Sequence, residues 1–275
     1  MRHVTLPDGE QVPSLGIGTW RMGENSRNRK SEVEALRTAI DLGITLIDTA
    51  EMYADGGSEE VVGEAVEGRR KDVFIVSKVL PRNASRSDTI AACERSLGHL
   101  KTDVIDLYLL HWRSSVPLGE TVEAFRQLQK AGKIRHWGVS NFDIGDMAEL
   151  GQLDPSCASN QVMYHLGSRG IEFELLPAAQ QSGMPVMAYS PLGAGDILGN
   201  TTLNEIAESR DVSPATVALA WVLRQNQVIA IPKSAKKARV KAFRDALDLS
   251  LNVYELQGLD KAFPAPRKRM PLAMS

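Results

Sequence analysis

Asp48-Thr49-Ala50-Glu51-Met52-Tyr53 is the stretch that decides how the chain folds and where its chemistry lies. It follows an apolar run, Ile44 to Ile47, whose length and β-branched content predict a buried strand. A carboxylate at the end of such a strand is costly to bury unless it is paired. Parallel α/β folds build their sites at strand ends that face one way. Partners for Asp48 and Tyr53 are therefore expected at neighbouring strand ends.

Strand-like and helical segments alternate along the chain after a short hairpin, in which 4–6 and 11–13 pair across Asp8-Gly9. Eight strand–helix units at a spacing of roughly thirty residues favour a closed parallel barrel over an open sheet. The predicted fold is α/β, a single (β/α)8 TIM barrel domain over 1–275 with an N-terminal β-hairpin and a surface tail over 263–275. The expected strands are 15–18, 45–47, 73–76, 104–110, 137–139, 158–162, 186–188 and 228–231. The expected helices are 31–42, 58–67, 87–100, 119–131, 144–150, 172–181, 203–208 with 214–224, and 236–247.

The composition predicts an ordinary soluble globular protein of the cytoplasm. Hydrophobic residues make up 43% and charged residues 24% of the 275 residues, and a net charge of −2 gives no reason to expect nucleic acid or an anionic membrane as partner. No apolar run has the length of a membrane span, and the N-terminus lacks the apolar core of a signal peptide. Cys93 and Cys157 have no metal-binding spacing and indicate a reducing compartment. No metal is expected.

Two further strand ends supply partners for the opening stretch. The third strand ends in Ser77-Lys78, and the fourth is followed by His111-Trp112. Alone, such a histidine is more often structural than catalytic, such a lysine is usually solvated, and the structural alternative for Asp48 is a helix cap. Together with Tyr53, the four side chains lie on the face where barrels carry chemistry, and this combination favours a catalytic site.

The charges of these four groups indicate acid catalysis. A free tyrosine has a pKa of roughly 10 and is a weak acid at neutral pH. An ammonium at Lys78 is expected to lower the pKa of Tyr53, and Asp48 supplies the counter-charge that Lys78 needs. His111 is placed to hold a carbonyl oxygen against Tyr53. Because no side chain delivers hydride, reduction of that carbonyl requires a cofactor.

Between about residues 4 and 250 the sequence resembles the aldo-keto reductase superfamily. The resemblance rests on an ordered series of motifs: Gly18-Thr19-Trp20, Asp48-Thr49-Ala50 with Tyr53, Ser77-Lys78, Leu110-His111-Trp112, Gly138-Val139-Ser140-Asn141-Phe142, Asn160-Gln161, Tyr189-Ser190-Pro191-Leu192-Gly193 and Ile231-Pro232-Lys233-Ser234. It implies that Asp48, Tyr53, Lys78 and His111 are the catalytic tetrad. It also implies NADPH bound across the C-terminal face of the barrel without a Rossmann fold, and no G-x-G-x-x-G opens a helix here.

The resemblance also assigns residues to each part of the cofactor. Ser140, Asn141 and Gln161 match the residues that hydrogen-bond the nicotinamide carboxamide, and Tyr189 matches the aromatic ring that stacks on it. A turn at Ser140-Asn141 and core packing of Tyr189 are the structural alternatives. The positions that match the rest of the cofactor site are Gly18, Thr19, Ser190, Leu192 and Asp196 along the ribose and pyrophosphate, and Lys233, Ser234 and Arg239 at the 2′-phosphate. Trp20 is also expected to contact the cofactor.

The 2′-phosphate residues predict NADPH rather than NADH, because a dianionic phosphate needs charge-assisted donors. Where the family often has Glu and Asn for the adenine, this chain has Ala242 and Phe243, which puts the adenine contacts in doubt. The substrate pocket is expected to be lined by Trp20, Met52, Leu80 and Trp112, and apolar walls of this kind suit small aldehydes and ketones.

The predicted function is thus NADPH-dependent reduction of small carbonyl compounds by a monomeric enzyme. One alternative is a cofactor-loaded sensor or interaction subunit, like the potassium-channel β-subunits that resemble this superfamily. Another is a barrel enzyme of isomerase or aldolase type, which would not require Lys233, Ser234, Arg239 or Tyr189. The sequence does not single out one physiological substrate among methylglyoxal, other 2-oxoaldehydes, keto-sugars and xenobiotic aldehydes.

Overall fold

Eight parallel strands form the centre of the protein, seen in a computed structural model that describes residues 2–274. Each strand pairs with its neighbour in chain order, and isolated bridges from Leu15 to Ala230 and from Gly18 to Lys233 join the first strand to the last. The predicted (β/α)8 barrel is therefore confirmed. The strands are β3 (Gly16–Gly18), β4 (Leu46–Asp48), β5 (Phe74–Val79), β6 (Ile105–Leu110), β7 (Ile134–Ser140), β8 (Asn160–Met163), β9 (Val186–Tyr189) and β10 (Val228–Ile231).

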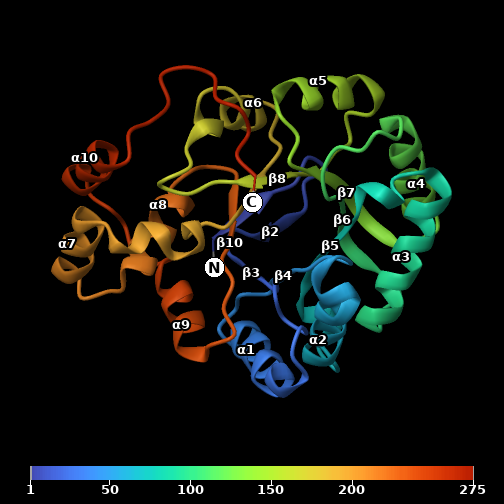
Figure 1. Ribbon diagram of the computed structural model, residues 1–275, viewed down its shortest axis with the longest axis horizontal. Coiled ribbons are helices and arrows are strands. Elements are labelled where there is room, and N and C mark those ends of the chain that lie inside the picture. The colour runs from blue at the N-terminus through green and yellow to red at the C-terminus, as the bar shows by residue number, and fades with distance from the viewer. Residues whose placement is uncertain (1, 275) are drawn as a thin grey trace.

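Helices surround the strands in a ring (Figure 1). Their caps follow the sequence signals: Ser213 caps the helix that begins at Pro214, and Gly43 and Gly132 follow helix ends with positive φ, as predicted. The helix Val253–Ala262 lies within a segment to which the sequence assigned no element. The α-helices are α1 (Arg29–Asp41), α2 (Gly57–Ala65), α3 (Arg86–Leu100), α4 (Leu118–Lys130), α5 (Ile144–Leu153), α6 (Leu175–Gln181), α7 (Thr201–Ser209), α8 (Pro214–Leu223), α9 (Lys237–Asp245) and α10 (Val253–Ala262), and the 3-10 segments are η1 (Ser26–Asn28), η2 (Tyr53–Gly56), η3 (Arg70–Asp72), η4 (Pro81–Asn83), η5 (Gly170–Glu172) and η6 (Gly193–Gly199).

Successive strand residues alternate between two apolar cores. In β6, Leu107 and Leu109 belong to an inner cluster that also includes residues from the N-terminal hairpin. Tyr108 and Leu110 belong instead to the larger cluster that packs against the helices. Because side chains alternate across a strand, the residues two apart from Leu107 and Leu109 also face the inside of the barrel. This alternation determines which residues reach the site.

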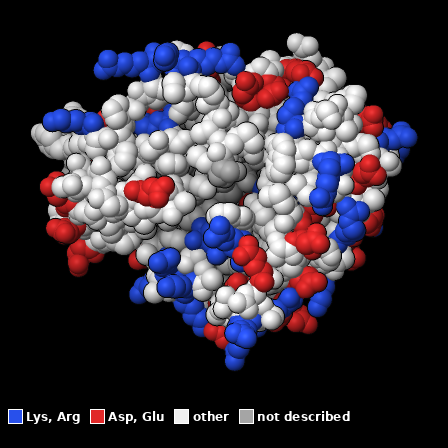
Figure 2. Space-filling model, in the orientation of Figure 1, with Lys and Arg blue, Asp and Glu red and all other residues white. Residues whose placement is uncertain are grey.

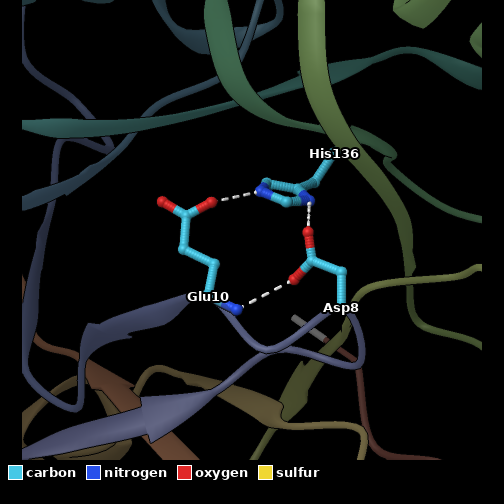
Figure 3. Close-up of side chains that lie close together, drawn as sticks. All are labelled: Asp8, Glu10 and His136. Atoms are coloured by element: carbon cyan, nitrogen blue, oxygen red, sulfur yellow. Dashed lines mark hydrogen bonds and ion pairs between the residues drawn. The ribbon is translucent and has the colours of Figure 1, made fainter.

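The N-terminal hairpin, β1 (His3–Thr5) and β2 (Gln11–Pro13), is fixed to the barrel through His136 of β7 (Figure 3). The Nε2 atom of His136 lies 2.6 Å from Glu10 Oε2, and its Nδ1 atom lies 3.4 Å from Asp8 Oδ2. Arg135 also donates to Glu10, at 2.6 Å. The two carboxylates contact opposite nitrogens of the ring, which is a hydrogen-bonding arrangement, since one ion cannot bind both nitrogens of a single imidazole.

The C-terminal segment after α10 runs past α6 toward the middle of the ring (Figure 1). The expected tail at 263–275 is irregular over its described part and lies at the surface. It is nevertheless held in place: Arg269 donates to Asp143 at 3.3 Å and lies 3.5 Å from Glu174, and Leu272 packs against the core.

Candidate active site

The alternation of side chains along the strands brings the predicted catalytic residues together. Leu46 and Val76 belong to the inner core. Asp48 and Lys78 lie two residues further along β4 and β5, so they also point inward, at the C-terminal end of the barrel strands. His111 follows β6 in the same way after Leu109. Tyr53 reaches the same place from the loop that leaves β4.

Lys78 is the centre of the cluster. Its ammonium is fully buried and donates to Asp48 Oδ1 at 2.7 Å, to the carbonyl of Thr49 at 2.8 Å and to the hydroxyl of Tyr53 at 3.5 Å. The second oxygen of Asp48 accepts from Gln161 Nε2 at 2.7 Å. Both charges of this buried pair thus have additional hydrogen bonds, the condition under which burial of an ion pair is tolerated.

The pKa of Tyr53 departs from the sequence prediction. Burial raises the pKa of Tyr53, Lys78 opposes that rise, and Asp48 adds to it, so the net direction is upward. The predicted lowering is wrong, because the strength of the desolvation cannot be read from residue types alone. For Lys78, burial lowers the pKa, but Asp48 and Tyr53 outweigh it and the net direction is again upward. Tyr53 therefore keeps its proton at neutral pH, the state that a proton donor needs.

His111 is a neutral imidazole at the edge of the cluster. Burial, aided by the charge of Lys78, lowers its pKa to about 3. Its ring meets Tyr53 edge-on at a centroid distance of 5.9 Å and lies 4.9 Å from the ring of Trp112. Its buried Nδ1 atom has no hydrogen-bond partner within the described chain. A neutral imidazole has one N–H to donate, so His111 can hold an acceptor such as a carbonyl oxygen.

The residues expected at the nicotinamide lie at the ends of β7, β8 and β9. Ser140 donates to the carbonyl of Gln161 at 2.8 Å, the Asn141 side-chain amide donates to the carbonyl of His111 at 3.1 Å, and the Tyr189 hydroxyl donates to Asn141 Oδ1 at 3.0 Å. Asn141 and Ser190 have φ of 59° and 49°. Left-handed residues other than glycine carry strain, which is concentrated at functional sites.

The residues predicted at the 2′-phosphate follow β10 or lie in α9. Lys233 lies beside Gly18 across the closing bridge of the barrel, and burial lowers its pKa. Neither Lys233 nor Arg239 forms an ion pair or a side-chain hydrogen bond with another residue of the described part of the chain. Ser234 is buried beside them, and its oxygen accepts from the backbone of Lys236 at 3.0 Å. A cation next to a hydroxyl, with a second cation in α9, suits a phosphate, whose charge would also offset the desolvation of Lys233.

The other residues assigned to the cofactor site differ in how far they are buried. Thr19 is fully buried: its hydroxyl and its backbone N–H both donate to the carbonyl of Asp48 at 3.0 Å, and its own carbonyl accepts from the backbone N–H of Met22 at 2.8 Å. Leu192 caps η6, in which Asp196 is exposed. Phe243 is buried in the core, so its side chain packs inside the protein and offers no polar group to an adenine.

A cavity of about 520 Å³ is lined by Met52 and Trp112, the sequence neighbours of Tyr53 and His111. Leu80 also lines it, so three of the four residues expected at the substrate pocket border one cavity. Trp20 does not line this cavity: its ring is half exposed and carries the guanidinium of Arg21 at 4.5 Å. On the side of the molecule seen in Figure 2, many charged side chains lie toward the edge, and a group of both signs lies just below the centre. The lining residues that the sequence analysis missed are Asp55, Pro81 and Arg82.

Glu51 is a further residue that the sequence analysis quoted without assigning a role. Its carboxylate accepts from the backbone N–H of Leu80 at 2.7 Å and from Asn83 at 2.9 Å. The signal for it was its position between two predicted catalytic residues, together with the cost of burying a carboxylate.

Comparisons with known proteins agree with this geometry. A sequence model described as "Aldo/keto reductase family" matches residues 14–263. Methylglyoxal reductase YeaE of Escherichia coli K12 is 55% identical over 270 residues, covering 96% of this chain and 95% of the relative, and glyoxal reductase of Bacillus subtilis 168 is 35% identical, covering 94% and 91%. An aldo/keto reductase from Klebsiella pneumoniae, crystallised with NADP and acetate, has 49% identity and a TM-score of 0.97 and covers 99% of each chain.

Proposed function

The chain belongs to the aldo/keto reductase family, and we propose that it reduces small 2-oxoaldehydes such as methylglyoxal, using Tyr53 as the proton donor. It is an oxidoreductase that converts aldehydes or ketones to alcohols with NADPH. The observation that carries the assignment of the acid is the 3.5 Å contact between the buried Lys78 ammonium and the Tyr53 hydroxyl, in a cluster completed by Asp48 and His111.

When bound, NADPH supplies the hydride that no side chain can provide. The His111 imidazole donates its one N–H to the carbonyl oxygen of the substrate and orients it. Tyr53 gives its proton to the same oxygen as negative charge develops there, and the adjacent Lys78 ammonium stabilises the phenolate that remains. Asp48 keeps Lys78 charged throughout. The raised pKa of Tyr53 is compatible with this role, because the reduced substrate is an alkoxide, a far stronger base than a phenolate.

The cofactor roles expected from the sequence are retained as part of this proposal. Ser140, Asn141 and Gln161 would bind the carboxamide, Tyr189 would stack on the ring, and Lys233 with its neighbours Ser234 and Arg239 would hold the 2′-phosphate. The donor chemistry at each position supports them.

Small 2-oxoaldehydes are favoured as substrates by the names of the relatives in Escherichia coli and Bacillus subtilis and by the apolar wall formed by Met52, Leu80 and Trp112. The sensor alternative receives no support from these relatives, which are reductases. We also propose a single-domain monomer of the cytoplasm; Cys93 and Cys157 are both free and buried, as suits a reducing compartment. No helix within residues 2–274 has the length and apolar character to cross a membrane.

The test measures NADPH oxidation with a panel of small carbonyl compounds, comparing the wild type with Tyr53→Phe. Loss of a general acid is expected to lower kcat by about 10²–10⁴-fold, while NADPH binding followed by fluorescence stays unchanged. Turnover of Tyr53→Phe at the wild-type rate would refute the assignment of the acid. Absence of turnover by the wild type with every carbonyl compound would refute the proposed substrate class.

A further inference from the structure

We propose that Glu51 is a specificity-determining residue, which holds two walls of the substrate cavity at a fixed separation and so favours small carbonyl compounds over bulky ones. The inference rests on the proposed carbonyl reduction. Within residues 2–274, the side chain of Glu51 bonds to Leu80, Asn83 and Arg95 and to none of the tetrad side chains, so its role is to position the residues that line the cavity.

Glu51 joins the two loops that form the cavity. Met52, its neighbour in sequence, lines the cavity from one loop, and Leu80, which precedes η4, lines it with Pro81 from another. The Oε1 atom of Glu51 accepts from Leu80 N at 2.7 Å and from Asn83 Nδ2 at 2.9 Å. One carboxylate oxygen thus binds the first and last residues of the 80–83 turn to the loop that carries Met52.

The backbone of Glu51 strengthens the same connection. Its N–H donates to the carbonyl of Lys78 at 3.3 Å, so side chain and main chain attach to consecutive parts of β5 and the loop after it. A second anchor acts from the opposite side, where Ser114 donates to the carbonyl of Pro81 at 2.9 Å. The turn is therefore held between two loops, and loss of Glu51 would free the side that faces Met52.

Burial shows which contacts of Glu51 matter. Its side chain is only 10% exposed, and charge-assisted hydrogen bonds in such surroundings are about twice as strong as neutral ones. Its other oxygen lies 3.3 Å from the guanidinium of Arg95, whose side chain is 53% exposed, and an exposed ion pair contributes little. The bonds to Leu80 and Asn83 are therefore the ones that restrain the cavity, and Arg95 offers a matched control.

The experiment compares Glu51→Ala with Glu51→Gln and Arg95→Ala. For each variant, kcat and KM are measured with methylglyoxal and with a bulky aromatic aldehyde, together with thermal unfolding and NADPH affinity. In Glu51→Ala, the preference for methylglyoxal in kcat/KM should fall about tenfold, mainly through a higher KM for methylglyoxal, with NADPH affinity unchanged. Glu51→Gln keeps an acceptor oxygen for Leu80 without its charge, so its shift should lie between those of Glu51→Ala and the wild type, whereas Arg95→Ala should resemble the wild type.

A readout independent of turnover is hydrogen exchange of the peptide that contains residues 80–83. Exchange should accelerate about tenfold or more in Glu51→Ala and stay unchanged in Arg95→Ala. Unchanged exchange in Glu51→Ala, or an equal loss of kcat/KM with both aldehydes, would overturn the inference. If Glu51→Ala does not fold, Asn83→Ala removes one donor and must shift the aldehyde preference in the same direction by a smaller factor; no shift would overturn the inference. A wild type that turns over neither aldehyde refutes the proposed function, whereas the exchange comparison still decides whether Glu51 holds the turn.

Discussion

Replacing Asp48 with Asn tests whether the buried ion pair supports Lys78. The substitution keeps the shape of the side chain and removes its charge, 2.7 Å from an ammonium with no solvent exposure. At an effective dielectric constant of about 20, two unit charges at that distance attract by about 6 kcal/mol. Desolvation of both groups offsets part of this, and the remaining bond to Thr49 retains some stabilisation. We therefore expect Asp48→Asn to lower the free energy of unfolding by about 3–5 kcal/mol at pH 7.

The stability lost in Asp48→Asn should depend on pH through the titration of Lys78. In the wild type, the raised pKa of Lys78 contributes stability at pH values below the unfolded pKa, and that stability is lost as pH rises through the folded pKa. Without Asp48, burial is expected to lower the pKa of Lys78 below its unfolded value, so the unfolded chain binds more protons and stability rises with pH. The difference in the free energy of unfolding between the wild type and Asp48→Asn, here called the deficit, should therefore shrink between pH 7 and pH 10.

The assay is urea unfolding at pH 6, 7, 8, 9 and 10. Asp106→Asn is the matched control, because Asp106 is also buried but its partners are Arg70 at 2.7 Å and Arg135 at 2.9 Å, which do not lose their protons in this range. Its deficit should not change with pH. A deficit for Asp48→Asn below about 1 kcal/mol at pH 7, or one that does not shrink as pH rises, would refute the reasoning.

Three further predictions concern other parts of the molecule. Lys233→Met should raise the KM for NADPH about tenfold or more and change that for NADH little, because only NADPH carries the 2′-phosphate; equal effects on both cofactors in steady-state kinetics would contradict the assignment. His111, with a folded pKa of about 3 and an ordinary value of 6.5, should cause stability to fall by up to about 4–5 kcal/mol as pH drops from 6.5 to 3, since the unfolded chain takes up the proton first. In His111→Asn, the free energy of unfolding should depend less on pH over this range than in the wild type. An unchanged pH dependence would refute the low pKa assigned to His111. Gly63→Ala should destabilise by about 1–3 kcal/mol in denaturant titrations, because a Cβ there lies 2.8 Å from the carbonyl oxygen of Leu100, whereas Gly98→Ala, with open space around it, should be neutral or stabilising; similar effects of the two would contradict the packing argument.

The barrel and the position of the tetrad could be predicted because both depend on local rules. Strand alternation determines that Asp48 and Lys78 point inward once β4 and β5 are assigned, and the register then brings them together. The direction of the pKa of Tyr53 could not be predicted in the same way, because it depends on how far burial outweighs one neighbouring charge. Residue types name the charges near Tyr53 but do not measure its desolvation.

Two other features were missed for different reasons. The helix α10 had a readable signal, since Asn252 and Glu255 form a capping box at its start. Glu51 lies between two predicted catalytic residues, but nothing local in the sequence identifies its partners: Leu80 and Asn83 lie about thirty residues away and meet it only after two loops have packed together. Hydrophobic periodicity and residue propensities do not predict contacts of this kind between loops.

The attachment of the N-terminal hairpin has a consequence for the order in which the chain assembles. Glu10 is held by Arg135 and His136, and Thr5 exchanges hydrogen bonds with Gln227, which is separated from it by 222 positions. During synthesis the hairpin therefore emerges from the ribosome long before the residues that anchor it. Closing such long loops carries an entropic cost that only the assembled barrel repays. The first element to be translated is thus expected to be among the last to dock.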